Sequence, residues 1–229
     1  ELVEIFKADP HMLTTLLGLA QEQMIKMERF GSIFADEVII GHSNEADFNE
    51  FKSDARSEAL KDRIIEVRIP YNLKVDDEVK ISDKVLRNSG LENVHIPPLT
   101  LPTMAVFAVL SRLEHPVGQG MTKLDKLRIY DGQVVQPYNI GDAEALRRQH
   151  PDEGMSGISP RYVMNRLSAV SSAPEVTCVS PLKALDSLWT GLKENVGLDA
   201  DDRFDYVELV KYTVEEYGQR AIREVQRAF

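Results

Sequence analysis

Short apolar runs alternate with helical stretches over the first part of the chain. Apolar residues gather at 1–6 and 37–41, and residues 63–69 alternate apolar and charged side chains. Each run predicts a strand, and the continuous run at 37–41 is typical of a strand buried on both faces of a parallel sheet. Strand, helix, strand, helix, strand is the order of a doubly wound α/β domain. Helical spacing covers residues 9–22 and 45–61, and a short hairpin is predicted at 24–34 around Gly31.

Beyond about Asn72 the pattern is mainly helical. Pro97-Pro98 marks a linker, and the glycines and Pro137 within residues 118–141 are typical of a mobile insertion or a small hairpin. A helical part is therefore expected to follow the α/β part. Helical spacing of apolar residues is found at 76–88, at 103–112, from Ser159 onward, at 181–195 and at 203–229, where it forms one continuous stripe.

The composition is that of an ordinary globular chain with an excess of acid. Its 37 acidic and 27 basic residues give a formal net charge of −10, so we expect neither a nucleic acid nor a membrane as partner. No apolar run approaches the roughly 20 residues of a membrane helix. The single cysteine, Cys178, fits a reducing compartment, which favours a cytoplasmic protein. The first residues look like the middle of a strand without an initiator Met, so we expect a fragment.

Asn44 follows the second predicted strand, in the segment Gly41-His42-Ser43-Asn44. A short polar side chain just beyond the carboxyl end of a parallel strand lies where such sheets bind ligands. An amide there can orient a water molecule or contact a terminal phosphate without adding charge. The alternative is that Asn44 caps the next helix, because Asn is a favoured cap and acidic residues crowd the turn that follows.

Two arginines occupy positions from which a cation can reach a phosphate. Arg63 stands between a polar helix and the third predicted strand, where it could stabilise charge in phosphoryl transfer at a neighbouring subunit. An ion pair with Asp62 or Glu58 is the alternative. Arg161 lies in the first turn of a helix that Ser159 is expected to cap. A cation there opposes the helix dipole, which suggests that it faces an anion.

Glu4, on the first predicted strand, could hold a magnesium ion through water or polarise an attacking hydroxyl; a solvated carboxylate is the alternative. The five histidines are scattered without paired metal spacing, so no metal site is expected. The sequence contains no G-x-x-x-x-G-K-[ST] segment, so this chain alone should bind ATP weakly. Cys178 is interpreted as a small buried residue and not as a nucleophile.

Six segments taken together resemble the PrkA serine protein kinases, a bacterial family within the AAA+ ATPases. The similarity is collinear over about residues 1–170 and becomes weaker beyond them. The segments are Glu4-Ile5-Phe6-Lys7-Ala8, Gly41-His42-Ser43-Asn44-Glu45, Ala59-Leu60-Lys61-Asp62-Arg63-Ile64, Val67-Arg68-Ile69-Pro70-Tyr71, Lys84-Val85-Leu86-Arg87-Asn88-Ser89 and Gly154-Met155-Ser156-Gly157-Ile158-Ser159-Pro160-Arg161.

This resemblance implies the latter half of an AAA+ doubly wound parallel-sheet domain, without its phosphate-binding half, followed by an α-helical lid and a helical C-terminal segment. The domains would be 1–95, 96–175 with an insertion at 116–153, and 176–229. For the complete protein the resemblance implies ATP and Mg²⁺ as cofactors, a protein substrate and assembly into a homo-oligomer.

The resemblance also implies roles for the candidate residues. By position, Asn44 would be the sensor-1 residue, Arg63 the arginine finger and Arg161 the sensor-2 arginine of the lid. Glu4 lies where the acidic end of the Walker B strand is expected, and Val3 stands where many AAA+ proteins have the magnesium-binding Asp. The implied activity is phosphoryl transfer from ATP to a protein serine, with the fragment alone inactive. The alternatives are an AAA+ remodelling ATPase without kinase activity and a non-enzymatic helical interaction module.

Overall fold

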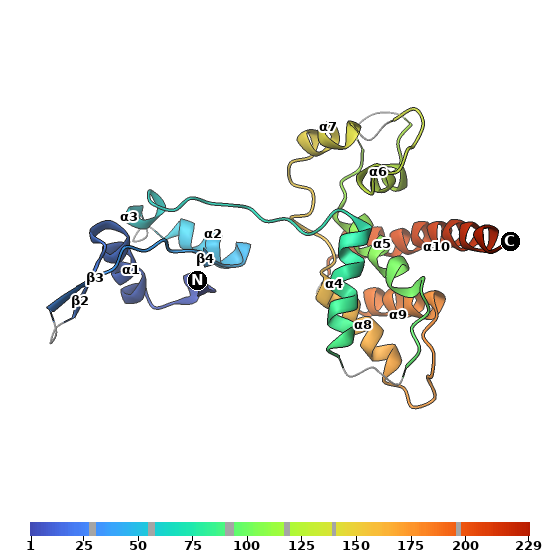
Figure 1. Ribbon diagram of the computed structural model, residues 1–229, viewed down its shortest axis with the longest axis horizontal. Helices are drawn as coiled ribbons and strands as arrows, with labels where there is room; N and C mark the ends of the chain where they lie inside the picture. Colours follow the sequence, from blue (N-terminus) through green and yellow to red (C-terminus); the bar gives the residue numbers. More distant parts are fainter. Residues whose placement is uncertain (28–30, 55–57, 90–93, 117–119, 139–140, 196–197) are drawn as a thin grey trace. The chain divides into compact units, whose positions relative to one another are not determined.

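A computed structural model of the protein describes residues 1–27, 31–54, 58–89, 94–116, 120–138, 141–195 and 198–229 (Figure 1). The chain forms two compact units, Glu1–Arg68 and Ile69–Phe229. Among the described residues, no helix combines the length and the apolar character needed to cross a bilayer.

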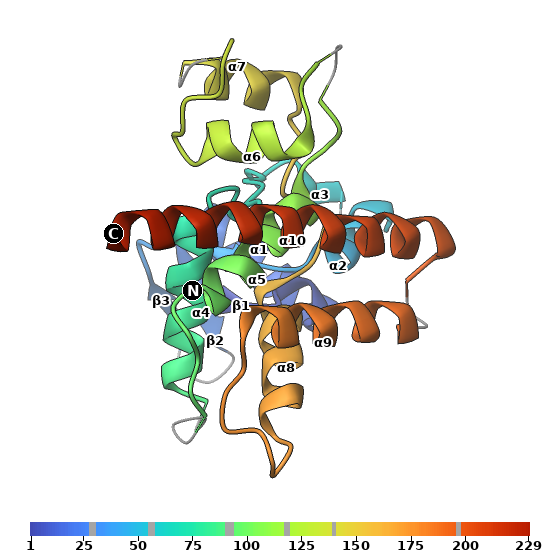
Figure 2. The same cartoon turned by 90° about the vertical axis from the view of Figure 1, so that its right-hand side faces the viewer.

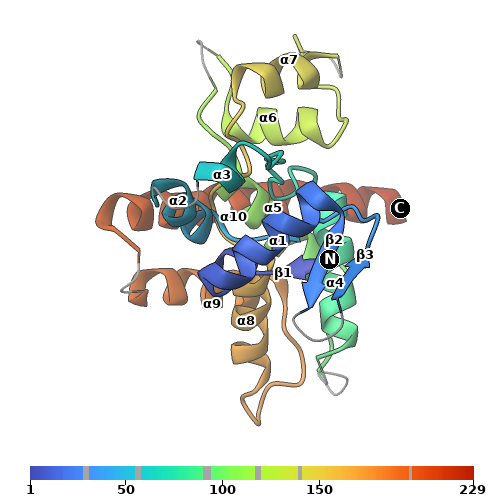
Figure 3. The ribbon, with the colours of Figure 1, turned by 90° about the vertical axis from the view of Figure 1, so that its left-hand side faces the viewer.

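The first unit is a small mixed α/β assembly (Figure 3). Strands β1 and β4 pair in parallel, with Leu2 opposite Gly41 and Val3 opposite His42. Strands β2 and β3 pair in antiparallel fashion, so the hairpin predicted at 24–34 is confirmed. The elements are β1 (Leu2–Val3), the 3₁₀ helix η1 (Ile5–Lys7), α1 (Pro10–Glu22), β2 (Met24–Met27), β3 (Gly31–Phe34), β4 (Gly41–His42), α2 (Glu45–Ser53) and α3 (Glu58–Lys61).

Three aromatic rings pack η1 against α2. Phe6 stacks on Phe51 with ring centroids 4.2 Å apart, and Phe48 lies 5.3 Å from Phe6. The helical spacing of Phe48 and Phe51 places both rings on one face of α2, and Phe51 is buried. This cluster fixes the turn that follows β1 against the helix that follows β4.

The strand predictions for this unit are largely wrong in extent. Only Leu2–Val3 and Gly41–His42 form a parallel pair, and residues 63–69 form no strand. Val38 and Ile65 are 87% and 89% exposed, so the run at 37–41 is not buried on both faces. The physical reason is that a strand needs a hydrogen-bonded neighbour on each side to become the interior of a sheet, and β1 pairs only with β4 among the described residues. The observed class is α/β, mostly helical, with a small parallel sheet.

The second unit is helical and is built around α5. Every residue from Thr103 to Arg112 is buried, and α4, α6, α8, α9 and α10 all contact this helix. Figure 2 shows α6 and α7 on one side of the long helix α10, with α8 and α9 on the other. The elements are α4 (Val75–Arg87), α5 (Thr100–Arg112), α6 (Lys123–Tyr130), α7 (Asp142–Gln149), α8 (Pro160–Ser171), α9 (Pro181–Glu194) and α10 (Ala200–Ala228).

Within the region 118–141, the described residues 120–138 contain more regular structure than the glycines indicate. Helix α6 begins at a capping box in which Thr122 and Asp125 satisfy each other's main-chain N–H groups. Its residues Leu127 and Ile129 are buried in the same core as α5. The prediction of a small hairpin or mobile insertion is therefore wrong for α6. Between Gly132 and Tyr138, the described residues form an isolated antiparallel bridge that joins Val135 and Tyr138.

Candidate functional site

The parallel pairing of β1 and β4 places two of the predicted site residues at one edge of the first unit. Glu4 directly follows β1, and Asn44 follows β4 by two positions. Because parallel strands end at the same edge, both side chains lie beyond the carboxyl ends of their strands. This is the arrangement that the sequence predicted for a ligand-binding edge.

Asn44 caps helix α2. Its Oδ1 accepts a hydrogen bond of 2.8 Å from the main-chain N–H of Asp47, and its Nδ2 donates one of 2.8 Å to the Asp47 carboxylate. The interpretation of Asn44 as a helix cap is thus confirmed. An amide nitrogen carries two hydrogens, so one N–H of this exposed side chain remains for another acceptor. Capping therefore does not exclude a contact with a ligand.

Glu4 is tied to Asn44 through two charged residues that the sequence analysis did not single out. Lys7 Nζ lies 3.2 Å from Glu4 Oε2 and 3.5 Å from Asp47 Oδ2. The hydrogen bond to Glu4 and the nearby charge of Asp47 raise the pKa of Lys7 above its usual value. The contacts Glu4–Lys7–Asp47–Asn44 therefore form a continuous chain along this edge, with one lysine between two carboxylates. The three-residue spacings Glu4 to Lys7 and Asn44 to Asp47 were the available signals.

The backbone at Glu4 is unusual. Its φ and ψ of 50° and 45° lie in the left-handed region, which is uncommon for a residue other than glycine. The turn ends β1 after two residues and leads into η1. It therefore redirects the chain at the point where the candidate carboxylate stands.

Arg63 lies just beyond α3 and is exposed. Its guanidinium donates a hydrogen bond to the main-chain oxygen of Ala59. In the part of the chain that the structure describes, the alternative ion pair with Asp62 or Glu58 is not formed. The side chain folds back on its own helix end, and the side-chain amide oxygen of Gln21 in α1 accepts hydrogen bonds of 2.5 Å from its Nη2 and 2.7 Å from its Nε.

Arg161 belongs to the second unit, in the first turn of α8. The predicted helix start is confirmed, since Ser159 Oγ accepts a hydrogen bond of 3.2 Å from Tyr162 N–H and Pro160 occupies the first turn. Arg161 is exposed and has no hydrogen-bond or ion-pair partner within the described ranges. Among the described residues, this cation at a helix N-terminus therefore forms no ion pair with an acidic side chain.

Hydrogen bonds to the end of α5 hold the segment before α8 in place. Ser111 Oγ accepts a hydrogen bond of 2.9 Å from Ile158 N–H, and Arg112 donates two hydrogen bonds to the Ile158 carbonyl. Gly157 has a φ of +106°, and a Cβ there would lie 2.7 Å from the Ser111 carbonyl oxygen. Only glycine allows this approach. The position of Arg161 is therefore set by contacts with the end of α5.

The described residues contain no group of three His, Cys, Asp or Glu side chains arranged to hold a metal ion. The four predicted site residues divide between the units: Glu4, Asn44 and Arg63 belong to the first and Arg161 to the second.

Comparisons with known proteins identify the family. Residues 1–119 match the model of the PrkA AAA domain, and residues 124–229 match the PrkA serine protein kinase C-terminal domain. The chain belongs to the PrkA family. Similarity to this family covers the whole chain, which agrees with the resemblance found in the sequence.

Two relatives illustrate this membership. The chain is 40% identical over 229 residues to the ATP-dependent protease PrkA of Bacillus subtilis and 30% identical over 234 aligned residues to the serine/threonine kinase YeaG of Escherichia coli K12. In both cases all of this chain aligns, and it spans 36% of the relative's length. No solved structure matches the chain.

Proposed function

We propose that this chain is part of an ATP-dependent serine protein kinase of the PrkA type, in which a phosphoryl group passes from ATP to a protein serine. The observation that carries the proposal is the parallel β1–β4 pair, because it brings Glu4 and Asn44 to one edge as phosphoryl transfer requires. Family membership and the name of the Escherichia coli relative support the same activity.

The exposed apolar residues of the first unit support the view that it is half of a larger AAA+ sheet. Val3, Val38, Ile40, Ile65 and Val67 are all exposed, although they are large and apolar. Residues of this type at strand positions are normally covered by neighbouring strands and helices. Since the chain spans only 36% of its relatives, the rest of the complete protein is long enough to supply that cover.

The residues of the first unit fit a contribution to an ATP and Mg²⁺ site. ATP supplies the γ-phosphoryl group, and Mg²⁺ in such sites takes one or two carboxylates together with water and phosphate oxygens. Glu4 is a single carboxylate at the correct edge, with Val3 beside it in place of an Asp. We assign Glu4 to a contact through water, because Lys7 already binds its oxygen directly.

Three polar side chains are assigned the remaining steps of phosphate binding and catalysis. The free N–H of Asn44 orients the nucleophile or contacts the terminal phosphate oxygen. Arg63, released from Ala59 and Gln21, reaches a neighbouring copy and stabilises charge on the transferring group. Arg161, which has no anionic partner among the described residues, binds phosphate from the lid. The arginine finger implies that the complete protein works as a homo-oligomer.

A second candidate function is ATP-driven remodelling or proteolysis without kinase activity. The name of the Bacillus subtilis relative, ATP-dependent protease, is the observation that favours it. The same three residues would serve that function, because ATP hydrolysis needs the same charge stabilisation with water as the acceptor.

One experiment on the complete protein separates the two candidates. Incubation with γ-labelled ATP and a serine-containing protein substrate should transfer the label to a serine hydroxyl. Label that appears only as free phosphate, or that accompanies cleavage of the substrate, would overturn the kinase proposal in favour of the second candidate. Absence of label from both the serine and free phosphate would overturn both candidate functions.

A further inference from the structure

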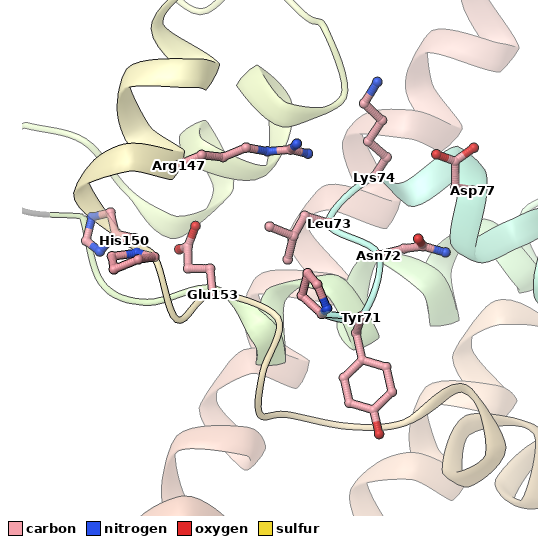
Figure 4. A pocket seen from close by; sticks show the side chains of 10 residues that line it. Tyr71, Asn72, Leu73, Lys74, Asp77, Arg147, His150 and Glu153 are labelled. Carbon is pink, nitrogen blue, oxygen red and sulfur yellow. The ribbon is translucent and has the colours of Figure 1, made fainter. Parts of the chain in front are cut away.

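The second unit contains a pocket that the proposed phosphoryl transfer does not use. Its volume is about 340 Å³, and it lies between the start of this unit and the end of α7 (Figure 4). It is lined by Pro70, Tyr71, Asn72, Leu73, Lys74, Asp77, Arg147, His150, Pro151 and Glu153.

The two acidic residues of this pocket already have cationic partners outside its lining. The buried carboxylate of Glu153 forms an ion pair with the buried Lys126, and it accepts hydrogen bonds of 2.6 Å from Tyr130 Oη and 2.8 Å from Glu114 N–H. Asp77 accepts a hydrogen bond of 2.8 Å from Lys80. The hydrogen bond and charge of Lys80 lower the pKa of Asp77, and the nearby charge of Lys74 lowers it further, so Asp77 offsets part of that cation.

Lys74 and Arg147 are the cations of the pocket. Neither forms an ion pair within the described part of the chain, and the contact recorded for the Arg147 guanidinium is with the ring of Tyr130, 5.5 Å away. Figure 4 shows the two side chains extending from different walls, Lys74 from the start of α4 and Arg147 from α7. The pocket thus presents two cations without close ion-pair partners of their own, in a chain whose formal net charge is −10.

The wall also contains a buried polar atom without a partner. His150 has 3% of its side chain exposed, and its Nδ1 lies 2.8 Å from Glu114 Oε2. Its Nε2 is buried and makes no hydrogen bond to any described residue. Such an atom costs free energy while it stays unpaired, and a ligand in the pocket reaches it only if the ring of His150 turns.

From these observations we infer that the pocket is a binding site for a small phosphate-bearing anion. Two opposed cations on flexible stems suit a tetrahedral dianion, and Tyr71, Leu73 and the two prolines offer apolar contact to a short organic group. The ligand is either free phosphate or the phosphate group of a small metabolite, since the two share the recognised chemistry.

Occupancy of this site would stiffen the first segment of the second unit. That segment is already held at two points, by the hydrogen bond of 2.9 Å from Arg112 Nη1 to the Asn72 carbonyl and that of 2.8 Å from Tyr71 N–H to the Gly154 carbonyl. A ligand on Lys74 adds a third point and links the segment to α7 through Arg147. The site is therefore suited to an effector that alters stability more than shape.

Calorimetric titration of the 229-residue chain at constant ionic strength tests the inference, with inorganic phosphate and glycerol phosphate as separate probes. Lys74→Ala and Arg147→Ala should each weaken binding by about ten-fold, the loss expected for one charge-assisted hydrogen bond. Tighter binding of glycerol phosphate than of phosphate would identify a metabolite as the ligand; the reverse order would identify free phosphate.

Two control variants sharpen the result. Arg148→Ala removes the neighbouring cation, which pairs with Glu144 at 2.6 Å and lies outside the lining, and should leave binding unchanged. Arg161→Ala tests whether the titrated phosphate binds instead at the proposed ATP site. Lack of binding by the wild type, wild-type affinity in both Lys74→Ala and Arg147→Ala, or loss of affinity in Arg161→Ala alone would overturn the inference. Both lining cations are exposed, and Lys74→Gln and Arg147→Gln replace any alanine variant that circular dichroism shows to be unfolded.

Discussion

Glu78 and Arg112 form a two-point ion pair in the interior of the second unit. Arg112 Nη1 lies 2.7 Å from Glu78 Oε2 and Arg112 Nη2 lies 2.8 Å from Glu78 Oε1. Neither side chain is more than 1% exposed. The same guanidinium donates to the carbonyls of Asn72 and Ile158, so it connects α4 and α5 with the start of the unit and the approach to α8.

Replacement of Arg112 by Met should destabilise the protein strongly, because it leaves the Glu78 carboxylate buried without a partner. We expect a loss of about 3–5 kcal/mol in the free energy of unfolding. Urea unfolding followed by circular dichroism measures it. The matched control is Arg87→Met on α4, whose partner Asp83 is partly exposed, and its cost should be at most about 1 kcal/mol. Equal losses in the two variants would contradict the importance of the buried pair.

Gly157→Ala should cost more stability than Gly120→Ala, although both glycines have a φ near +105°. The backbone penalty for alanine is shared and amounts to about 1–3 kcal/mol. Only at Gly157 would the added Cβ meet neighbouring atoms, 2.7 Å from the Ser111 carbonyl oxygen, whereas at Gly120 nothing lies within 4 Å. The difference between the losses in unfolding free energy of the two variants therefore measures the cost of the close approach at Gly157. No difference would show that the packing before α8 adapts.

Glu216 should make stability depend on pH. Burial raises the pKa of this carboxyl, but the hydrogen bonds and charges of Arg128 and Arg220 outweigh burial and hold the pKa below its usual value of 4.5. A lowered folded-state pKa adds stability that is complete above the unfolded-state pKa and is lost as the pH falls through the folded-state pKa.

The variant Glu216→Gln should therefore be less stable than the wild type at about pH 7, by about 2 kcal/mol, and the difference should shrink below about pH 4.5. Urea unfolding at a series of pH values measures this. The control on the same helix is Glu208→Gln, whose surface pair with Lys211 should contribute little at any pH. If the difference in unfolding free energy between Glu216→Gln and the wild type stayed constant to well below pH 4.5, Glu216 would not be the source of the pH dependence.

Two variants of Asn44 separate its capping role from its proposed contact with phosphate. Asn44→Asp keeps an acceptor for Asp47 N–H but replaces the amide N–H that bonds the Asp47 carboxylate, so it should retain the cap, lose part of the stability to repulsion between the two carboxylates, and lose ATP turnover in the complete protein. Asn44→Ala should lose about 1 kcal/mol as well as turnover. Full turnover in Asn44→Asp would remove Asn44 from the proposed site.

Arg63→Ala should abolish ATP turnover of the complete protein while leaving nucleotide affinity nearly unchanged, because a finger acts on the transition state and not on the bound nucleotide. Nucleotide binding and phosphate release measure the two effects. Arg68→Ala, a nearby exposed arginine that pairs with Glu45, is the control and should keep its turnover. Wild-type turnover in Arg63→Ala as well as in Arg68→Ala would exclude Arg63 as the arginine finger.

Local sequence determined several of the helix starts of this protein. Asn44, Thr122, Ser159 and Ser180 each cap a helix through a side chain that accepts from a main-chain N–H three residues ahead. A capping contact of this kind involves residues within four positions of one another, so it can be recognised in the sequence alone. Ser159 and Asn44 were recognised in this way; Thr122 was missed because the glycines around it favoured a loop.

The tertiary structure alone decided which strands distant in the sequence pair and which distant charges meet. Residues 37–41 and 63–69 have the apolar pattern of strands, yet a strand forms only where a neighbour accepts its main-chain hydrogen bonds, and β4 forms only opposite β1. The contacts of Lys7 with Asp47, of Arg112 with Glu78 and of Lys126 with Glu153 join residues 27 to 40 positions apart. Such contacts depend on how the helices pack, and no local pattern specifies it.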